Sequence, residues 1–406
     1  MRIALINRFF PPDGAITGRS LDEFARYLVD ALPNAEVRVF CSQAEYRSKN
    51  KAQSGDGIAV ERLSFAKVPV PGNIGRLLTS MIEGRKLARE AVKWGDVVIS
   101  MTDPPLLGYW IARELDRLGD RAPVWIEWTM DLYPEAFVAA GLSTPKNPIY
   151  KTIEKKLKDV TPDAFICLGP EQAKFVAERR TSHAPTFILP CGIVDRSDFE
   201  GGELPSWRVD EDRIVFVYAG NIGQAHCVDL LPTLIECSDP EKHVFVLALY
   251  GAHADATKQR VSSASNVKHV EYVSYAEAIH ADVHIASLDP TWNHVCVPSK
   301  AVSSVCLGKP ILYAGNDASD NSNMLARGMW RVERDGELAE YKAQLTEVLS
   351  IISAPEMRSE KQSNALKIAG DLASLRNSTF AEINDWISSN VPANGIAPSE
   401  GPKTVI

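Results

Sequence analysis

The sequence predicts an α/β protein built from two doubly wound, Rossmann-like domains that face a common cleft. Three observations predict this fold class. The chain has 406 residues, which is too long for one ordinary hydrophobic core. Short runs rich in β-branched residues alternate with longer amphipathic segments, as in a parallel sheet covered by helices on both faces. The alternation stops in a stretch rich in proline and glycine at 190–212, which we interpret as an interdomain linker, and then starts again.

The first half of the chain is expected to form one domain, at 1–195. Its strands are predicted at 2–7, 37–41, 58–63, 96–100, 123–128, 164–168 and 186–189. Helical patterns separate them at about 18–32, 74–93, 106–118, 146–159 and 170–180. Because helices separate successive strands, the sheet should be parallel.

The second half repeats the pattern, and we assign a second domain to 205–372. Its predicted strands are 214–219, 244–250, 267–271, 283–287 and 310–313, and its predicted helices are 227–237, 255–264, 275–280 and 298–307.

The segment 335–389 has a helical period throughout. In its last part, at about 374–390, Phe380, Ile383 and Ile387 fall on one face, and we expect this helix to cross back to the first domain. Residues 391–406 are rich in proline and glycine and are expected to be disordered.

Composition and charge exclude several classes of function. The formal net charge of -8 argues against nucleic acid as the main partner. Seven scattered cysteines without a Cys-x-x-Cys pair indicate reduced thiols rather than a zinc site or a disulfide framework. No signal peptide and no run of 18 apolar residues is visible, so we expect a cytoplasmic protein. No Asp-x-Asp follows a predicted strand, so we expect neither a carboxylate-bound metal nor a cofactor.

Chemistry is expected in the loops that follow the strands, because open α/β sheets bind ligands at their carboxyl ends. In the loop after the first strand, Gly14 and Gly18 would let the backbone approach an anionic ligand at a helix N-terminus, with Arg19 beside it. Arg8 and Thr17 of the same loop are assigned to the acceptor side. The alternative is a structural turn whose arginines are solvated.

Two acids follow the strand at 123–128. Asp131 is the better placed to orient an acceptor hydroxyl, and Glu135 is second. The alternative for Asp131 is a helix cap.

In the second domain, Gly220 and Gly223 end the first strand before a helix. With Asn221, Gln224 and His226 they would form a seat for a diphosphate. The alternative is an ordinary strand-to-helix turn.

Lys300 and Ser299 lie in the first turn of the predicted helix 298–307. A lysine at the positive end of a helix dipole is unfavourable by itself, which suggests that it binds an anion there. We expect an exposed lysine that holds no other element in place. The alternative is a flexible lysine with no ligand.

Five segments taken together resemble glycosyltransferase family 4. They are PPDGAITGRSLDEFARYL, MTDPPLLGYWIA, IEWTMDLYPEAFVAAGL, FVYAGNIGQAHCVDLLPTLI and VPSKAVSSVCLGKPILYAG. They most resemble the branch of bacterial fucosaminyltransferase-like enzymes of O-antigen (lipopolysaccharide) and capsule assembly, and the matches run in order from residue 2 to about 315. The resemblance implies a GT-B fold, no metal, retention at the anomeric carbon and a donor held mainly by the second domain.

The sequence departs from the family pattern in three places. Val295 and Ser303 stand where the family has a Glu-x7-Glu pair whose second glutamate grips the donor ribose. Asn221, Gln224 and His226 replace a basic pair that binds the diphosphate. Met130 stands where a histidine usually precedes the loop aspartate.

The resulting hypothesis is a retaining glycosyltransferase that moves a hexose-type sugar from a nucleoside diphosphate sugar to a glycan or lipid-linked acceptor. Lys300 would be the main phosphate cation, with Ser299 assisting, and Asp131 would orient the acceptor. Ser303 would contact the ribose, and the loop at Tyr272 and Val273 would cradle the base. The alternative is a catalytically degenerate GT-B subunit that binds ligand and supports a partner enzyme.

The stretch 67–93 carries six basic residues against two acids in an otherwise acidic protein. Apolar residues recur there at helical spacing. A basic amphipathic helix on the acceptor domain could contact an anionic membrane at the inner leaflet and meet a lipid-linked sugar there. The alternative is a core-packed helix with a solvated basic face.

Overall fold

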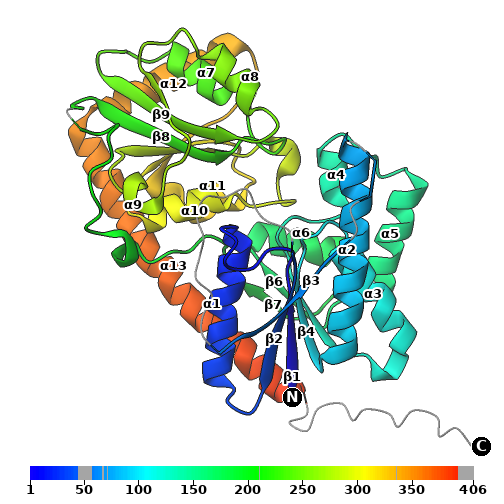
Figure 1. The fold of residues 1–406 in the computed structure, drawn as a ribbon. Coiled ribbons are helices and arrows are strands. Elements are labelled where there is room, and N and C mark those ends of the chain that lie inside the picture. Colours follow the sequence, from blue (N-terminus) through cyan, green and yellow to red (C-terminus); the bar gives the residue numbers. More distant parts are fainter. Residues whose placement is uncertain (44–56, 66–67, 71, 210, 335, 392–406) are drawn as a thin grey trace, which may run out of the picture.

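The computed structural model describes residues 1–43, 57–65, 68–70, 72–209, 211–334 and 336–391. It contains two parallel sheets, one above the other in Figure 1, each covered by helices on both faces. The predicted fold class is therefore confirmed. Apart from Val391, the tail expected to be disordered lies outside the described residues.

The first sheet has seven parallel strands in the order β3-β2-β1-β4-β5-β6-β7. The order reverses between β1 and β4, which is the switch point of a doubly wound sheet. The strands are β1 (Arg2–Ile6), β2 (Glu36–Ser42), β3 (Ala59–Leu63), β4 (Val97–Met101), β5 (Val124–Trp128), β6 (Ala164–Cys167) and β7 (Thr186–Ile188).

Among the described residues, six α-helices belong to this domain. They are α1 (Ile16–Ala31), α2 (Gly72–Trp94), α3 (Leu107–Leu118), α4 (Glu135–Ala139), α5 (Pro148–Asp159) and α6 (Pro170–Arg180). Local chemistry sets some of their starts: Asn147 caps α5 by accepting from the N–H of Ile149, and Pro148 occupies the first helical position.

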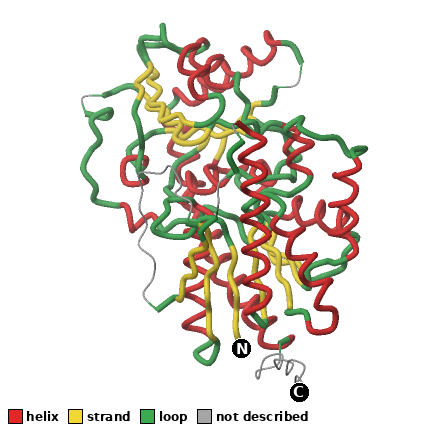
Figure 2. Tube along the Cα trace, turned by 45° about the vertical axis from the view of Figure 1, so that its right-hand side comes forward, coloured by secondary structure: helices red, strands yellow, loops and turns green. Residues whose placement is uncertain are grey.

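The second sheet has six parallel strands in the order β10-β9-β8-β11-β12-β13. The strands are β8 (Ile214–Asn221), β9 (His243–Tyr250), β10 (Val267–His269), β11 (Val283–Ser287), β12 (Ile311–Ala314) and β13 (Met329–Val332). Its helices are α7 (Leu230–Glu236), α8 (Ala254–Arg260), α9 (Tyr275–Ala278), α10 (Ser299–Cys306), α11 (Asp320–Met324) and α12 (Leu338–Ser353). Figure 2 shows how helices and loops enclose both sheets.

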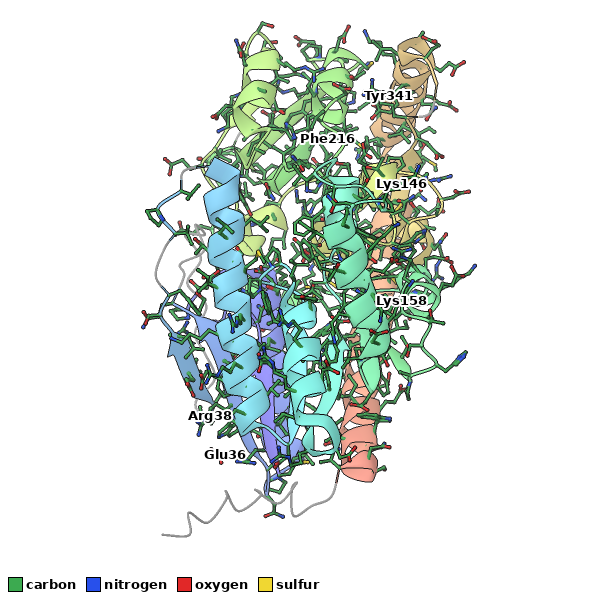
Figure 3. The ribbon with its side chains drawn as sticks, turned by 90° about the vertical axis from the view of Figure 1, so that its right-hand side faces the viewer. Glu36, Arg38, Lys146, Lys158, Phe216 and Tyr341 are labelled. Atoms are coloured by element: carbon green, nitrogen blue, oxygen red, sulfur yellow. The ribbon has the colours of Figure 1, made fainter. Side chains whose placement is uncertain are left out.

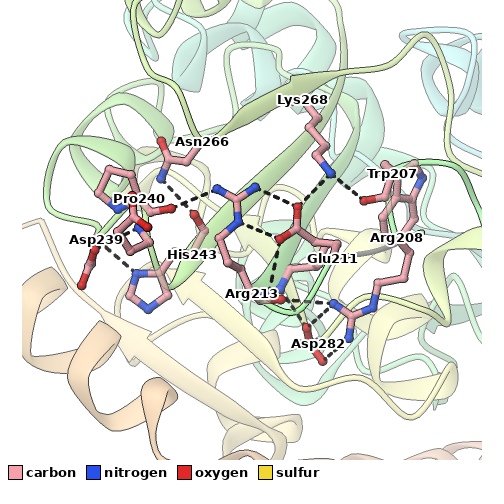
Figure 4. A network of polar contacts seen from close by, with 12 residues as sticks. Trp207, Arg208, Glu211, Arg213, Asp239, Pro240, His243, Asn266, Lys268 and Asp282 are labelled. Atoms are coloured by element: carbon pink, nitrogen blue, oxygen red, sulfur yellow. Dashed lines mark hydrogen bonds and ion pairs between the residues drawn. The ribbon is translucent and has the colours of Figure 1, made fainter.

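A network of ion pairs closes the amino-terminal end of the second sheet, away from the loops that could carry chemistry (Figure 4). Glu211 accepts from Arg213 at 2.7 Å and from Lys268 at 2.9 Å. Mainly because Arg213 donates to it, the pKa of Glu211 falls to about 2. Asp282 is held in the same way by Arg208 and by the N–H of Val215. These charges stabilise the domain rather than serve a ligand.

The helix predicted over 335–389 is in fact two helices. A break at Ala354 separates α12 from α13 (Pro355–Asn390), and Pro355 occupies the first position of α13. The far half of α13 crosses to the first domain (Figure 1). There Phe380, Ile383 and Ile387 are buried in the core of the first sheet, and Thr379 Oγ1 donates to the carbonyl of Ile188 at 3.0 Å.

Across the residues that the structure describes, no helix combines the length and the apolar composition needed to cross a membrane.

Candidate functional site

The candidate site lies at the junction where the carboxyl ends of the two sheets meet. Direct contacts join the domains there. The N–H of Leu132, after β5, donates to the carbonyl of Val295 at 2.8 Å, and the rings of Phe175 and His294 stack with centroids 5.6 Å apart. The loops that the sequence singles out in each domain are thereby brought together.

Lys300 is the central cation on the side of the second domain. Its Nζ donates to the carbonyl of Asn221 at 3.2 Å and lies 3.8 Å from the centroid of the Tyr218 ring. Burial at the junction lowers the pKa of Lys300 to about 7. The expectation that Lys300 holds no other element is therefore wrong, because its contacts tie α10 to the end of β8.

Gly220, beside this lysine, requires glycine mainly because of its backbone conformation. Its φ of 132° is a conformation that L side chains rarely adopt, and an added Cβ would lie 3.2 Å from Lys300 Cε.

The loop after β8 offers backbone donors. Among the described residues, nothing accepts a hydrogen bond from the N–H of Gly223 or Gln224. His226 turns inward, with Nδ1 3.0 Å from the carbonyl of Ser287. Burial, and to a smaller extent the Lys300 charge, lower its pKa to about 4. His226 is thus neutral at pH 7, so the charge for an anion must come from elsewhere.

Arg19 approaches the same region from α1 of the first domain. Its guanidinium carbon lies 6.0 Å from the centroid of the Tyr275 ring in the second domain. Tyr275 Oη in turn lies 3.1 Å from Ser303 Oγ on α10. Within the described part of the chain, neither Arg19 nor Lys300 has a carboxylate within ion-pair distance.

Ser303 is not open to a ribose in this structure. It is 4% exposed, and its hydroxyl donates to the carbonyl of Gly192 at 2.8 Å. Gly192 has a φ of 97°, and a Cβ there would lie 2.6 Å from the carbonyl oxygen of Ser299. Ser303 therefore holds the linker against α10.

The remaining donor-side residues surround this cluster. Tyr272 and Val273 lie in the loop before α9, where burial raises the pKa of Tyr272 to about 12. In the first domain, α1 begins after Ala15, which gives the helix no side-chain cap, and Gly14 lies just before it. Gly18 packs so closely that a Cβ would lie 2.9 Å from the carbonyl oxygen of Phe9.

Asp131 stands on the acceptor side, between β5 and α4. Its side chain still touches solvent, but the protein around it raises its pKa to about 6 by desolvation. Thr17 Oγ1 accepts from Asn7 Nδ2 at 3.1 Å, which ties the start of α1 to the end of β1.

Asp103 is the residue that sequence reasoning missed. It lies two residues after the end of β4, as Asp131 lies three residues after the end of β5, and that position after a strand was the available signal. Arg8 Nη1 lies 4.0 Å from Asp103 Oδ1, and Arg8 Nη2 lies 2.9 Å from Glu83 Oε2. Desolvation raises the pKa of Asp103 to about 6; Arg8 opposes this shift, and the charges of Asp131 and Glu83 add to it. Arg8 is therefore part of a carboxylate-rich cluster on the acceptor side.

Glu135 does not join this cluster. It is 6% exposed, and its Oε1 lies 3.4 Å from Arg179 Nε and 3.9 Å from Arg180 Nη1. It therefore pairs with α6 and does not face Asp131. Within the described residues, no three histidine, cysteine, aspartate or glutamate side chains are grouped to hold a metal ion.

No protein-family model matches the chain. The chain is 24% identical over 246 residues to the probable glycosyltransferase WbjE of Pseudomonas aeruginosa. The matched region covers 57% of this chain and 60% of WbjE. The match thus spans less than two thirds of the relative's length.

Two solved structures share the fold over nearly the whole chain. Sucrose-phosphate synthase of Thermosynechococcus elongatus superposes with a TM-score of 0.69 at 13% identity, covering 96% of this chain and 100% of that one. HepE of Anabaena, solved in complex with UDP and glucose, superposes with a TM-score of 0.65 at 14% identity, covering 96% and 100%. The chain has the two-domain GT-B architecture that the family resemblance implies.

Proposed function

We propose that this GT-B chain is a glycosyltransferase that moves a sugar from a nucleoside diphosphate to a hydroxyl of an acceptor. One observation carries the proposal. Lys300 of the second domain lies beside the loop that offers the unpaired N–H groups of Gly223 and Gln224, and Arg19 of the first domain reaches the second domain at Tyr275. Among the described residues, neither cation has a carboxylate partner. Cations and free N–H groups at strand ends are what a diphosphate requires.

In this proposal the site works by electrostatics and positioning. Negative charge builds on the diphosphate as the sugar leaves, and the Lys300 ammonium and the loop N–H groups stabilise it. The acceptor hydroxyl is held close to the anomeric carbon from the other domain. Asp131 or Asp103 accepts the one hydrogen bond that this hydroxyl can donate. The bond from the anomeric carbon to the diphosphate breaks as the bond to the acceptor oxygen forms, the hydroxyl proton leaves with the diphosphate, and no protein nucleophile takes part.

The finer assignment is a retaining transfer of a hexose-type sugar in the assembly of a surface polysaccharide. The order of the family 4-like segments supports it, and so does the binding of UDP and glucose by the GT-B protein HepE. We also propose that transfer needs no metal, because Lys300 and Arg19 supply the positive charge that a metal would bring.

The exposed surface of α2 supports the proposal that the acceptor is lipid-linked. Leu77, Leu78 and Ile82 are 37%, 39% and 46% exposed, and Arg85 and Lys86 follow them on the exposed side of the helix. An exposed apolar strip that continues into basic residues fits an anionic membrane surface better than water alone. The part of the sequence prediction at 67 and 71 falls outside the described residues.

The second candidate is a GT-B subunit that binds a nucleotide sugar without turning it over. Val295, at the position of the first family glutamate, is 5% exposed and packs beside Leu132. Ser303, at the position of the second, is bonded to Gly192. These two positions give this candidate its support.

Release of nucleoside diphosphate from nucleotide sugars tests the proposal. The protein is incubated with a panel of nucleotide sugars that includes UDP-glucose, with and without about 5 mM EDTA to remove metal ions. We expect nucleotide release that EDTA does not change. If sugars of the panel bind but none of them releases nucleoside diphosphate, the second candidate is favoured.

Lys300→Ala should reduce the rate of release by about 100-fold or more, because one charge that stabilises the leaving group is lost. The loss of its contact with Tyr218 should also lower the melting temperature. Lys367→Ala, an exposed lysine on α13, is the matched control and should keep the wild-type rate.

Lys300→Arg separates charge from packing. Since the pKa of Lys300 is about 7, the wild-type protein should bind UDP more weakly as the pH rises through 7 and the ammonium loses its proton. Arginine stays protonated, so the variant should bind UDP with little change over the same range. An equal pH dependence in both proteins would remove Lys300 from the phosphate site.

A further inference from the structure

The loop that carries Asp131 is fixed to helix α6. Gln172, in the first turn of α6, is fully buried, and its Nε2 donates to the carbonyl of Met130 at 3.1 Å. Its Oε1 accepts from Thr129 Oγ1 at 3.0 Å. The Gln172 amide therefore fixes the positions of Thr129 and Met130, the two residues that precede Asp131.

The other end of α6 holds the residues after Asp131. Arg180 is 4% exposed, and its Nη2 donates to the carbonyl of Tyr133 at 3.1 Å. The backbone on each side of Asp131 is thus bonded to a buried side chain of the same helix. Any shift of α6 along its axis must move Asp131.

The start of α6 is capped by the opposite domain. The helix has no side-chain cap from its own N-cap residue, Gly169. Instead, Asp320 of α11 accepts from the N–H of Glu171 at 2.8 Å and from the N–H of Gln172 at 2.9 Å. Asp320 is 2% exposed, so its carboxylate is taken out of water for this contact.

The chain leaves room for this carboxylate. A Cβ on Gly169 would lie 2.2 Å from Asp320 Oδ1, so only glycine fits at that position. A buried carboxylate is costly unless hydrogen bonds satisfy it, and the two N–H groups and the helix dipole do so here. When the two domains are apart, the same N–H groups and the same carboxylate must form their hydrogen bonds with water instead.

We propose that Asp320 is a positioning residue for Asp131. With the domains together, its carboxylate orders the first turn of α6, and α6 then holds the Asp131 loop through Gln172 and Arg180. The domain that binds the donor thereby prepares the acceptor side for the transfer. The role of Asp131 in this inference rests on the proposed function; the coupling between Asp320 and the loop does not.

Hydrogen exchange on the full chain tests the coupling directly. Asp320→Ala is compared with the wild type for the amides of the first turn of α6 and of the loop 129–135. We expect faster exchange in both segments, because the loop loses its support with the helix. Arg376→Ala is the matched control, since it breaks an ion pair of 2.5 Å with Glu23 that ties α13 to α1 and touches neither α6 nor the loop. It should leave both segments at the wild-type rate.

Faster exchange confined to the first turn of α6, with the loop 129–135 unchanged, would reduce Asp320 to an ordinary helix cap and overturn the inference. Asp320→Asn gives a second reading should Asp320→Ala not fold. Its amide oxygen can accept one of the two N–H groups, so exchange in both segments should lie between the wild type and Asp320→Ala. Wild-type exchange of the loop in Asp320→Asn, with a loosened α6, would also overturn it.

Kinetics then distinguish positioning from binding. Asp320→Ala should lower kcat for transfer by between about 10- and 100-fold, as expected when a reacting group is misplaced, and leave the Kd for UDP close to the wild-type value. A raised Kd for UDP with unchanged kcat would contradict the inference. If no nucleotide sugar is turned over by the wild type, the proposed function fails, and the exchange experiment still decides whether Asp320 controls the loop.

Discussion

Asp131 and Asp103 follow neighbouring strands of the first sheet, and both have a pKa of about 6. Desolvation is the main cause for each, and the charge of Asp131 adds to the shift of Asp103. Two carboxylates close together at a site with a single nearby arginine favour a neutral, hydroxyl-bearing partner over an anion. This is the property expected on the side of a sugar acceptor.

Asp131→Asn should lower the rate of transfer and leave nucleotide affinity nearly unchanged, because the aspartate belongs to the domain opposite Lys300. In the wild type, the carboxylates take up protons as the pH falls through 6, so transfer should slow there. The variant should show a weaker dependence over the same range.

Transfer rates from pH 5 to 8 and titrations with UDP measure these effects. Asp120→Asn, at an exposed position after α3, is the control and should behave like the wild type. An equal loss of UDP binding in Asp131→Asn would place Asp131 on the donor side.

At the scale of the element, α2 exposes several apolar residues close together. Figure 3 looks onto the face of the first domain formed by α2, α3 and α5, where Lys146 and Lys158 flank α5. The buried side of α2, with Leu87, Ala88 and Ala91, seals the sheet. Its apolar residues Leu77, Leu78 and Ile82 are therefore not required for the core.

We expect the protein to float with anionic liposomes at low salt, and less at physiological salt, because exposed charges are screened over about 8 Å there. Replacing Arg85 and Lys86 by glutamate should abolish flotation without changing UDP affinity. Leu78→Ser should weaken it at both salt concentrations.

In the matched control, Lys258 and Lys367 of the second domain are replaced by glutamate, and this variant should float like the wild type. Protein that stays in the bottom fraction at both salt concentrations would leave α2 as a core helix with a solvated basic face.

At the scale of the whole molecule, α13 links the two domains. Phe380 is 4% exposed, and its ring centroid lies 4.8 Å from that of Phe24 and 5.3 Å from that of Tyr27. Phe380→Ala should lower the free energy of unfolding by about 3–5 kcal/mol, through lost transfer energy and the cavity left behind.

Urea unfolding followed by tryptophan fluorescence measures this loss, and Glu382→Ala, an exposed neighbour on the same helix, should change stability by less than about 0.5 kcal/mol. A loss in Phe380→Ala no larger than that of the control would mean that α13 is not part of the first core.

The fold class was predictable because strand and helix periods are local properties of the chain. The same locality explains the misses. β13 was missed because only the five-residue α11 and a three-residue 3-10 helix separate it from β12, so no helical period marks where it begins. The break between α12 and α13 lies in a stretch whose period continues across Pro355. Lys300 was proposed from its place in the first turn of a helix and Asp131 from its place after a strand; both are local signals, and Asp103 carried the second one too.

Asp320 and Gln172 could not have been predicted as neighbours of the site. Each lies in the first turn of a helix that follows a strand, where a polar residue is ordinary, and their importance comes from a contact between residues 148 positions apart. The inward turn of His226 and the hydrogen bond that occupies Ser303 likewise depend on how distant segments pack.

The route of α13 has a consequence for how the protein is made. The core of the first sheet includes Phe380, Ile383 and Ile387, which the ribosome adds only after every strand of the second domain. Until then Phe24 and Leu28 on α1 lack their covering helix, and an uncovered apolar face of a nascent chain invites association with other chains. The first domain to be synthesised is therefore the last to be finished, and a chain that stops before α13 has both domains present but leaves the core of the first one uncovered.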